Sequence, residues 1–136
     1  MRVASATAPL QILLVEDHAD TRNAMSFLLR RQGHTVAIAD TVESAYNVFS
    51  EQPIDVILTD LLLPDGNGWE LVERVRRHRD VAAIAISGCC EAEDCERSAA
   101  HGFARHLIKP IDPSHLIQAL NEIVERRSAN QAERAS

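Results

Sequence analysis

The stretch IDVILTDLLLPDGNGWEL, residues 54 to 71, decides the fold of this chain. It begins with IDVILT, a mostly apolar run without Gly or Pro, which is typical of a short buried strand. Asp60 ends this run, and Pro64 with the DGNG run at 65–68 indicates a turn. Helical spacing of apolar residues follows over 67–78. The stretch predicts one strand–turn–helix unit with a carboxylate where the strand ends.

The same unit recurs on both sides of this stretch. Five apolar runs predict strands, at residues 10–15, 35–39, 54–59, 82–87 and 104–108. Each is followed by a segment with helical spacing, at about 19–32, 42–50, 67–78, 91–101 and 113–127. Strict alternation of strands and helices predicts an α/β protein with a doubly wound parallel sheet, covered by helices on both faces.

In two of these helices the apolar spacing indicates which face should be buried. The helix over 19–32 places Ala24, Phe27 and Leu28 on one face, with Arg31 as a further candidate. The last helix carries one apolar stripe: Leu116, Ile117, Leu120, Ile123 and Val124. We expect both faces to pack on the sheet.

Composition excludes several classes of protein. With 136 residues, 46% of them hydrophobic, the chain can form one compact domain. A net charge of -6 argues against direct nucleic-acid binding, because the phosphate backbone is bound by excess Lys and Arg. No apolar run approaches the roughly 20 residues that span a bilayer, and no signal peptide is recognised. We therefore expect a cytoplasmic protein without membrane insertion.

One basic run, containing Arg74, Arg76, Arg77 and Arg79, falls late in a predicted helix. Cations complement the helix dipole at that end, so we interpret the run as a solvated helix end.

The cysteines Cys89, Cys90 and Cys95 invite a metal or redox interpretation. They contain no CxxC pair and no second cluster, so we interpret them as reduced structural thiols. His18 is interpreted as a loop histidine rather than a transition-metal ligand.

Polar residues stand where four of the predicted strands end: Glu16-Asp17, Asp60, Ser87 and Lys109. In doubly wound folds, ligands bind beyond these carboxyl ends. Three carboxylates in one crevice repel one another unless a cation neutralises them, and Mg²⁺ is the natural partner. Lys109 is the only lysine in the chain, and its compact ammonium reaches where a guanidinium would not fit. The chemistry indicates a site for a phosphoryl group.

The ordered segments LLVEDH, VILTDLLLPDGNGWEL, IAISG and HLIKP resemble the receiver domain of two-component response regulators over residues 10 to 127. The resemblance implies a flavodoxin-like (βα)5 fold with a five-stranded parallel sheet in the order 2-1-3-4-5. It also implies that a histidine kinase or a histidine phosphotransfer protein transfers a phosphoryl group to an aspartate, with Mg²⁺ or Mn²⁺ as cofactor.

Carried over to this sequence, the resemblance makes Asp60 the phosphoacceptor. Asp17 becomes a direct metal ligand, Glu16 an acidic residue acting through water, and the Leu62 carbonyl the remaining protein ligand. Asp60 would attack phosphorus in line, because its carboxylate is already ionised and needs no base. Such a protein is not an enzyme for other substrates. It catalyses only its own phosphorylation and dephosphorylation.

Three further positions follow from the same resemblance. Ser87 would turn inward to hydrogen-bond the phosphoryl group, and Lys109 would pair with a phosphoryl oxygen. The bond before Pro110 would be cis. His106 occupies the position of an aromatic switch residue, although a half-exposed strand histidine is an equally good interpretation. If it switches, its protonation would link signalling to pH, which NMR of its ring upon phosphorylation tests.

Leu62 and Cys89 occupy positions that resemble those tuning phosphoryl lifetime. Neither side chain readily orients an attacking water. We therefore expect slower autodephosphorylation than in a variant with polar residues there, which a phosphate-release assay measures.

Beyond the domain at 10–127, we expect a flexible N-terminal extension over 1–9 and a flexible tail over 128–136. The tail is too short for an output domain, so a downstream partner or a homodimer must receive the signal. The resemblance assigns this role to the face formed by 91–101, 104–108 and 113–127. A stand-alone regulator and a receiver taken from a hybrid histidine kinase both fit.

Two other functions would each require a different residue in the motif. A phosphohydrolase of the haloacid dehalogenase type would carry an aspartate two residues after the nucleophile, where Leu62 stands. A receiver-like domain that is not phosphorylated would lack Asp17, Asp60 or Lys109, and all three are present.

Overall fold

The structure is a computed structural model that describes residues 9–88 and 92–135. Its centre is a five-stranded sheet in which every neighbouring pair is parallel. The strand order is β2-β1-β3-β6-β7, which confirms the predicted order 2-1-3-4-5 when these five strands are counted along the chain. The strands are β1 Gln11–Val15, β2 Thr35–Ala39, β3 Val56–Asp60, β6 Ala82–Ser87 and β7 Arg105–Ile108.

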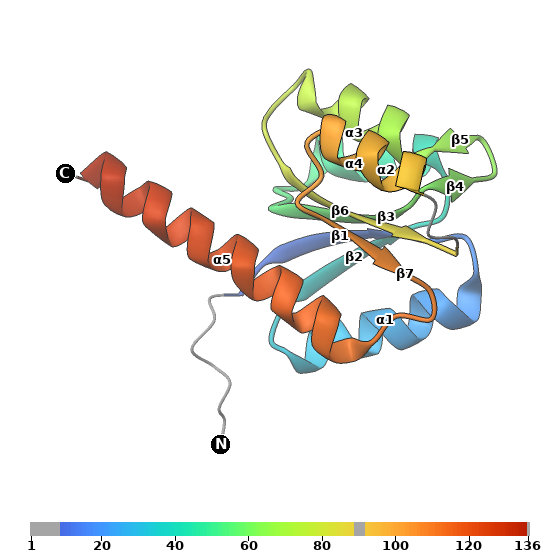
Figure 1. Ribbon diagram of the computed structural model, residues 1–136, viewed down its shortest axis with the longest axis horizontal. Helices are drawn as coiled ribbons and strands as arrows, with labels where there is room; N and C mark the ends of the chain where they lie inside the picture. The colour runs from blue at the N-terminus through green and yellow to red at the C-terminus, as the bar shows by residue number, and fades with distance from the viewer. Residues whose placement is uncertain (1–8, 89–91, 136) are drawn as a thin grey trace.

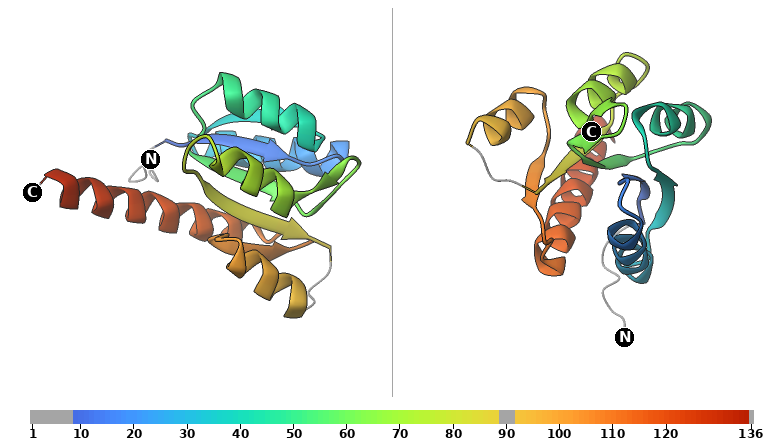
Figure 2. Two further views of the ribbon diagram at one scale, coloured as in Figure 1. Left: turned by 90° about the horizontal axis from the view of Figure 1, so that it is seen from above. Right: turned by 90° about the vertical axis from the view of Figure 1, so that its right-hand side faces the viewer.

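Helices cover both faces of this sheet. Figure 1 shows α2, α3 and α4 above the strands and α1 with α5 below them, and Figure 2 shows the same layers from two further directions. The helices are α1 Ala19–Arg31, α2 Val42–Glu51, α3 Gly68–Arg76, α4 Ala92–Ala100 and α5 Pro113–Ala135. The arrangement confirms the doubly wound α/β fold.

Alternation along the strands divides the core between the two layers. On β1, Ile12 and Leu14 belong to the cluster that packs against α1 and α5, whereas Leu13 and Val15 pack with α2 and α3. All four side chains are fully buried. Burying one side chain of this size stabilises the fold by about 1.5–3 kcal/mol. Strand β1 is therefore packed on both faces.

The buried face of α1 agrees with the predicted one only at Leu28, which is partly buried against the core. Met25 and Leu29 are buried against the sheet, whereas Phe27 is 63% exposed. Apolar residues occupy both stripes of this helix, so spacing alone fits two rotations about its axis. The rotation observed buries the larger pair Met25 and Leu29 and leaves Ala24 exposed.

The predicted turn after β3 contains a small hairpin. Strands β4 Leu62–Leu63 and β5 Gly66–Asn67 pair antiparallel before α3 begins. Asp65 at the hairpin accepts hydrogen bonds from the backbone N–H groups of Val42, at 2.7 Å, and Glu43, at 3.1 Å. The loop that follows Asp60 thus caps the first turn of α2.

The last helix is longer than the predicted range 113–127. Helix α5 continues to Ala135, so the backbone over 128–135 is helical rather than irregular. These residues contain neither Gly nor Pro, and Ala, Gln, Glu and Arg favour helix, so no local signal ends it at 127. Figure 1 shows the last turns extending beyond the sheet. The predicted N-terminal extension lies outside the described residues, except for position 9.

Within the described ranges 9–88 and 92–135, no helix combines the length and the apolar character needed to cross a membrane.

The basic run at the end of α3 is not simply a solvated helix end. The Arg76 guanidinium donates to the carbonyl oxygens of Val81, His101 and Gly102, which ties α3 to two neighbouring loops. Arg79 donates to the carbonyls of two residues near the end of α2, Phe49 and Gln52. Guanidinium groups carry five donors, so one side chain can join several backbone segments.

Candidate functional site

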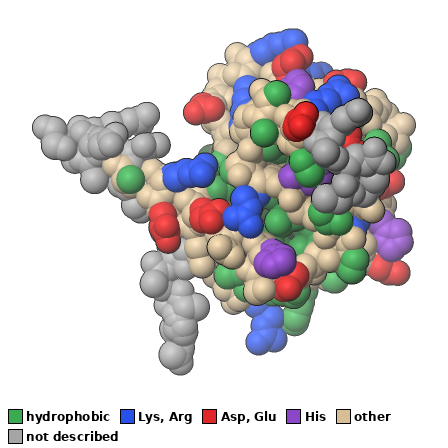
Figure 3. All heavy atoms as spheres, viewed as in Figure 1, with side chains coloured by type: hydrophobic (Ala, Val, Ile, Leu, Met, Phe, Trp, Pro, Cys, Tyr) green, Lys and Arg blue, Asp and Glu red, His purple; other side chains and the backbone are tan. Residues whose placement is uncertain are grey.

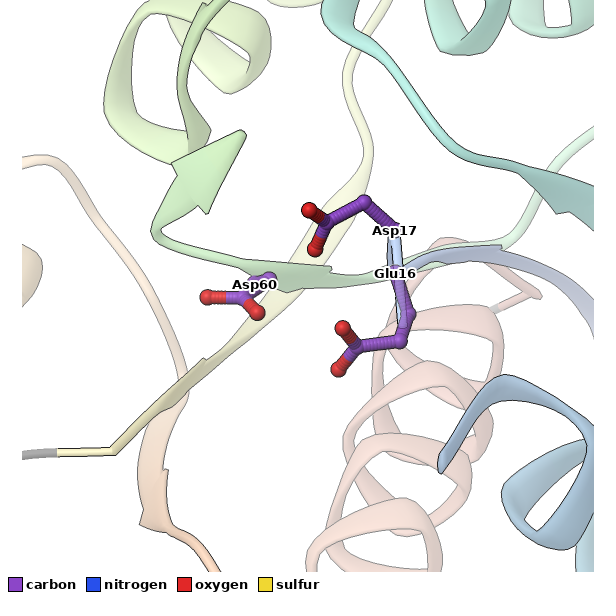
Figure 4. Close-up of side chains that lie close together, drawn as sticks. All are labelled: Glu16, Asp17 and Asp60. Atoms are coloured by element: carbon purple, nitrogen blue, oxygen red, sulfur yellow. The ribbon is translucent and has the colours of Figure 1, made fainter. Parts of the chain in front are cut away.

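The site lies where the parallel strands end. Asp60 is the last residue of β3, and Glu16 with Asp17 directly follows β1. One oxygen of each carboxylate lies within 4.8 Å of the others. Figure 4 shows Glu16 and Asp17 extending from the end of β1 toward the end of the neighbouring strand β3, where Asp60 lies. The structure therefore brings together the three carboxylates that the strand ends predicted.

Lys109 joins two of these carboxylates. Its Nζ lies 2.8 Å from Asp60 Oδ2 and 2.8 Å from Glu16 Oε1. Glu16 is fully buried and Asp60 is 7% exposed, so the pairs lie in a largely dry crevice. Burial by itself lowers the pKa of Lys109, but the hydrogen bonds and charges of Asp60 and Glu16 together raise this pKa above its ordinary value. Lys109 is charged at neutral pH.

Backbone groups hold the carboxylates in place. The N–H of Leu62 donates to Asp60 Oδ1 at 3.1 Å, and the N–H of His18 donates to Glu16 Oε2 at 3.1 Å. Both oxygens of Glu16 are therefore engaged by this chain. Asp17, in contrast, is exposed. The three carboxylates differ in how readily they can turn toward a ligand.

The charges and donor atoms of this crevice fit a hard divalent cation. Three carboxylates and one ammonium leave two uncompensated negative charges. The donors are oxygen atoms, which Mg²⁺ and Mn²⁺ prefer, and an exposed side such as that of Asp17 leaves room for water ligands. Glu16, Asp17 and Asp60 are the residues that can hold such an ion.

Close packing beneath Asp60 involves a residue that the sequence interpretation assigned only to a turn. A Cβ atom on Gly68 would lie 2.8 Å from the Asp60 carbonyl oxygen and 3.1 Å from Thr59 Cγ2. Glycine allows the first turn of α3 to approach the end of β3 this closely. The glycine-rich run at 65–68 was the sequence signal for this close packing. Spacing alone did not show which of its glycines contacts the end of β3.

Ser87 and His106 contact each other. Ser87 Oγ lies 2.8 Å from His106 Nε2, which connects the end of β6 with a residue inside β7. Burial lowers the pKa of His106, and the charge of Asp94 on α4 opposes this effect only in part. The imidazole is therefore mostly neutral at pH 7.

Three further predicted residues are Leu62, Pro110 and His18. The Leu62 side chain is 76% exposed, next to the site. The Lys109–Pro110 bond is cis, as expected. His18 caps α1, because its Nδ1 accepts from the N–H of Thr21 at 3.3 Å. Cys89 and Cys90 lie outside the described residues. Within the described ranges, the one group of acidic, His or Cys side chains close enough to hold a metal is Glu16, Asp17 and Asp60.

Comparison with known families points to one family. The model described as response regulator receiver domain matches residues 12–121. The phosphate regulon transcriptional regulatory protein PhoB of Escherichia coli (strain K12) is 31% identical over 121 residues, which cover 87% of this chain and 53% of PhoB. The chain thus spans about half the length of this relative. An uncharacterized 14.6 kDa protein of Leptolyngbya boryana is 30% identical over 118 residues, covering 85% of this chain and 90% of that protein.

Solved structures show the same fold. A CheY-like response regulator receiver domain protein from Methanospirillum hungatei JF-1 matches with a TM-score of 0.84 and 24% identity, over 90% of this chain and 99% of that one. The non-phosphorylated HemR receiver domain from Leptospira biflexa matches with a TM-score of 0.77 and 28% identity, over 86% of this chain and 94% of that one.

Proposed function

The chain belongs to the response regulator receiver domain family, and we propose that Asp60 accepts a phosphoryl group from a histidine kinase or histidine phosphotransfer protein. One observation carries this proposal. The Lys109 ammonium lies 2.8 Å from Asp60 Oδ2, at the mouth of a crevice with two further carboxylates. A positive charge already aimed at the Asp60 oxygens can pair with a phosphoryl oxygen once the group is transferred.

The acidic cluster supports a requirement for a divalent cation, Mg²⁺ or Mn²⁺. We propose Asp17 and Asp60 as direct ligands, with the Leu62 carbonyl as a third. Glu16 would act through water, since Lys109 and the His18 N–H already engage its two oxygens. When bound, the ion neutralises charge on the transferring phosphoryl oxygens.

This chain's residues have separate tasks in the transfer. The Leu62 N–H holds Asp60 Oδ1 at 3.1 Å and thereby fixes the direction of the attacking carboxylate. Lys109 balances the charge that the phosphoryl group brings into a dry crevice. Because the attacking group is an ionised carboxylate, no proton has to be removed from it. We propose that the protein promotes only its own phosphorylation and dephosphorylation.

Receiver domains interact with histidine kinases and downstream partners in two-component systems. We propose that the downstream partner, or a second copy of the chain, reads the face formed by α4, β7 and α5. Ser87 contacts His106 on β7, and Arg105 on the same strand pairs with Glu122 of α5 at 2.8 Å. Movement of the Ser87 hydroxyl toward a phosphoryl group would break the first contact and release His106.

The proposal is tested by incubation with acetyl phosphate and Mg²⁺, followed by intact mass measurement. We expect one phosphoryl adduct that requires the ion. It should be absent from Asp60→Asn and retained in Asp80→Asn, which removes an exposed carboxylate near the opposite ends of the strands. An adduct of equal yield in Asp60→Asn would contradict the proposal. The absence of any adduct would favour a receiver domain that signals without phosphorylation.

A further inference from the structure

An apolar surface lies at the edge of the sheet, away from the acidic crevice. The large hydrophobic side chains exposed within the described residues are Phe27, Ile38 and Leu62. Leu62 belongs to the hairpin beside Asp60. Phe27 on α1 and Ile38 on β2 are 63% and 38% exposed, respectively. Two of the three therefore occur on neighbouring elements at one edge.

These two side chains border a hollow. It has a volume of about 450 Å³ and is lined by Asn23, Ser26, Phe27, Arg30, Arg31 and Ile38. Figure 3 shows hydrophobic and basic side chains side by side on the underside of the molecule, where Figure 1 places α1. We call these six residues the α1–β2 surface. A hollow of this size accepts one or two apolar side chains.

The α1–β2 surface is positively charged, although the chain as a whole carries -6. Arg30 Nη2 donates to the Val36 carbonyl at 3.2 Å, and the Arg31 guanidinium lies 5.6 Å from the centre of the Phe27 ring. Both cations are thereby held beside the apolar hollow. No acidic residue of the described ranges lines it. The surface is complementary to a segment that combines apolar side chains with carboxylates.

We propose that the α1–β2 surface binds an acidic amphipathic helix of a partner protein. Such a helix presents apolar residues at i and i+4 to the hollow and carboxylates on the flanks to Arg30 and Arg31. A second copy of this chain fits less well. In a two-fold symmetric contact this surface would face its own copy, which brings the arginines of both chains together without an acidic lining residue, and like charges repel.

The surface is separate from the crevice that holds Asp60. β2 is an edge strand, and β1 lies between it and β3, which carries Asp60. A helix bound over α1 and β2 therefore leaves the acidic crevice accessible. The inference does not depend on phosphorylation, so binding is expected with the Asp60→Asn variant as with the wild type.

The experiment is an NMR titration of the ¹⁵N-labelled chain with a synthetic helical peptide that carries Leu at i and i+4 and Glu on both flanks. A matched peptide has Lys in place of each Glu. We expect the acidic peptide to shift amide signals of α1 and β2 and the basic peptide to leave them unchanged. Phe27→Ser and the double variant Arg30→Gln/Arg31→Gln should each weaken binding about tenfold or more, whereas Leu62→Ser should bind as the wild type does.

Three results would overturn the inference. The two peptides could bind equally, or the shifts could centre on Leu62 and the hairpin. Alternatively, sedimentation could show that the wild type self-associates and that Phe27→Ser does not, which would assign the surface to a second copy. Because Phe27, Arg30 and Arg31 are exposed, their replacement should preserve the fold, and the spectrum of each variant checks this directly.

Discussion

Lys109 has two contacts of 2.8 Å that suit a compact ammonium, one to Asp60 and one to Glu16. A planar guanidinium is broader and cannot occupy the same point between both carboxylates. We therefore expect Lys109→Arg to slow phosphoryl uptake from acetyl phosphate about tenfold, or about 1.4 kcal/mol, although the charge is preserved. A time course of intact mass measures the rate.

The matched control is Arg105→Lys on β7, the reverse exchange of the same two residue types. Arg105→Lys keeps a cation opposite Glu122 and lies outside the acidic crevice. It should phosphorylate at the wild-type rate. If Lys109→Arg also did so, charge alone would be sufficient at position 109 and the geometric argument would be wrong.

His34 makes folding stability depend on pH. Its buried Nδ1 accepts a hydrogen bond from the Leu10 N–H at 3.0 Å, and burial lowers its pKa. The unfolded chain therefore binds a proton more readily than the folded chain. The stabilising contribution of neutral His34 should be fully present above about pH 6.5. It should decrease as the pH falls below that value.

Urea unfolding at pH 7.5 and pH 5.5 measures this dependence. The stability of His34→Asn should change less between the two pH values, whatever its absolute stability, because the titrating group is gone. His106, whose pKa is also lowered, contributes in the same direction and remains in the variant. An identical pH dependence in the wild type and the variant would exclude His34 as the source.

At the level of single residues, the sequence predicted the groups at the strand ends and missed the arginine contacts that join α3 to neighbouring segments. Glu16, Asp17 and Asp60 could be found because parallel strands bring their carboxyl ends to one edge. The contacts of Arg76 and Arg79 could not be found, because their partners are backbone carbonyls in loops and at the end of α2. Carbonyls carry no side-chain signal, so a basic run gives no indication of them.

Among the elements, α2 depends on a residue that lies 23 positions from its start. Asp65 accepts from the N–H groups of Val42 and Glu43, and the first of these bonds contributes most to lowering its pKa. Asp65→Ala should destabilise the fold by about 1 kcal/mol, since two N–H groups of the first turn lose their acceptor. Urea unfolding measures the change.

Glu51→Ala, at the other end of α2, is the control and should have little effect. The contribution of Asp65 should also disappear as the pH falls through its lowered pKa, because only the ionised carboxylate accepts both bonds. If Asp65→Ala and Glu51→Ala unfold at the same urea concentration, the capping contact does not stabilise α2.

The limits of prediction at this scale are physical. The strands over 35–39 and 82–87 were predicted at both ends, as apolar runs without internal Gly or Pro that stop at Asp40 and Gly88. The rotation of α1 about its axis was not predicted, since this helix has two apolar stripes, formed by Ala24, Met25, Phe27 and Leu29. The length of α5 was not, because the hydrophobic stripe ends near Val124 whereas helix propensity continues.

For the molecule as a whole, repulsion between the three carboxylates of the crevice lowers the folding stability. A bound divalent cation would reduce this repulsion. We expect Mg²⁺ to raise the unfolding temperature by several degrees, since an ion at a hundredfold excess over its Kd adds about 2.7 kcal/mol to the stability. Asp17→Asn should abolish the response, and Asp80→Asn should preserve it. A calorimetric scan with and without Mg²⁺ makes the comparison. An undiminished response in Asp17→Asn would place the ion elsewhere.

The central claim is that Asp60 carries the phosphoryl group, and one measurement tests it most directly. Borohydride reduces an aspartyl phosphate to homoserine, and peptide mapping by mass spectrometry then identifies the reduced residue. After phosphorylation with acetyl phosphate and Mg²⁺, we predict homoserine at position 60 and unchanged residues at 16 and 17. Homoserine at position 17, or none anywhere in a chain that has gained a phosphoryl group, would contradict the account.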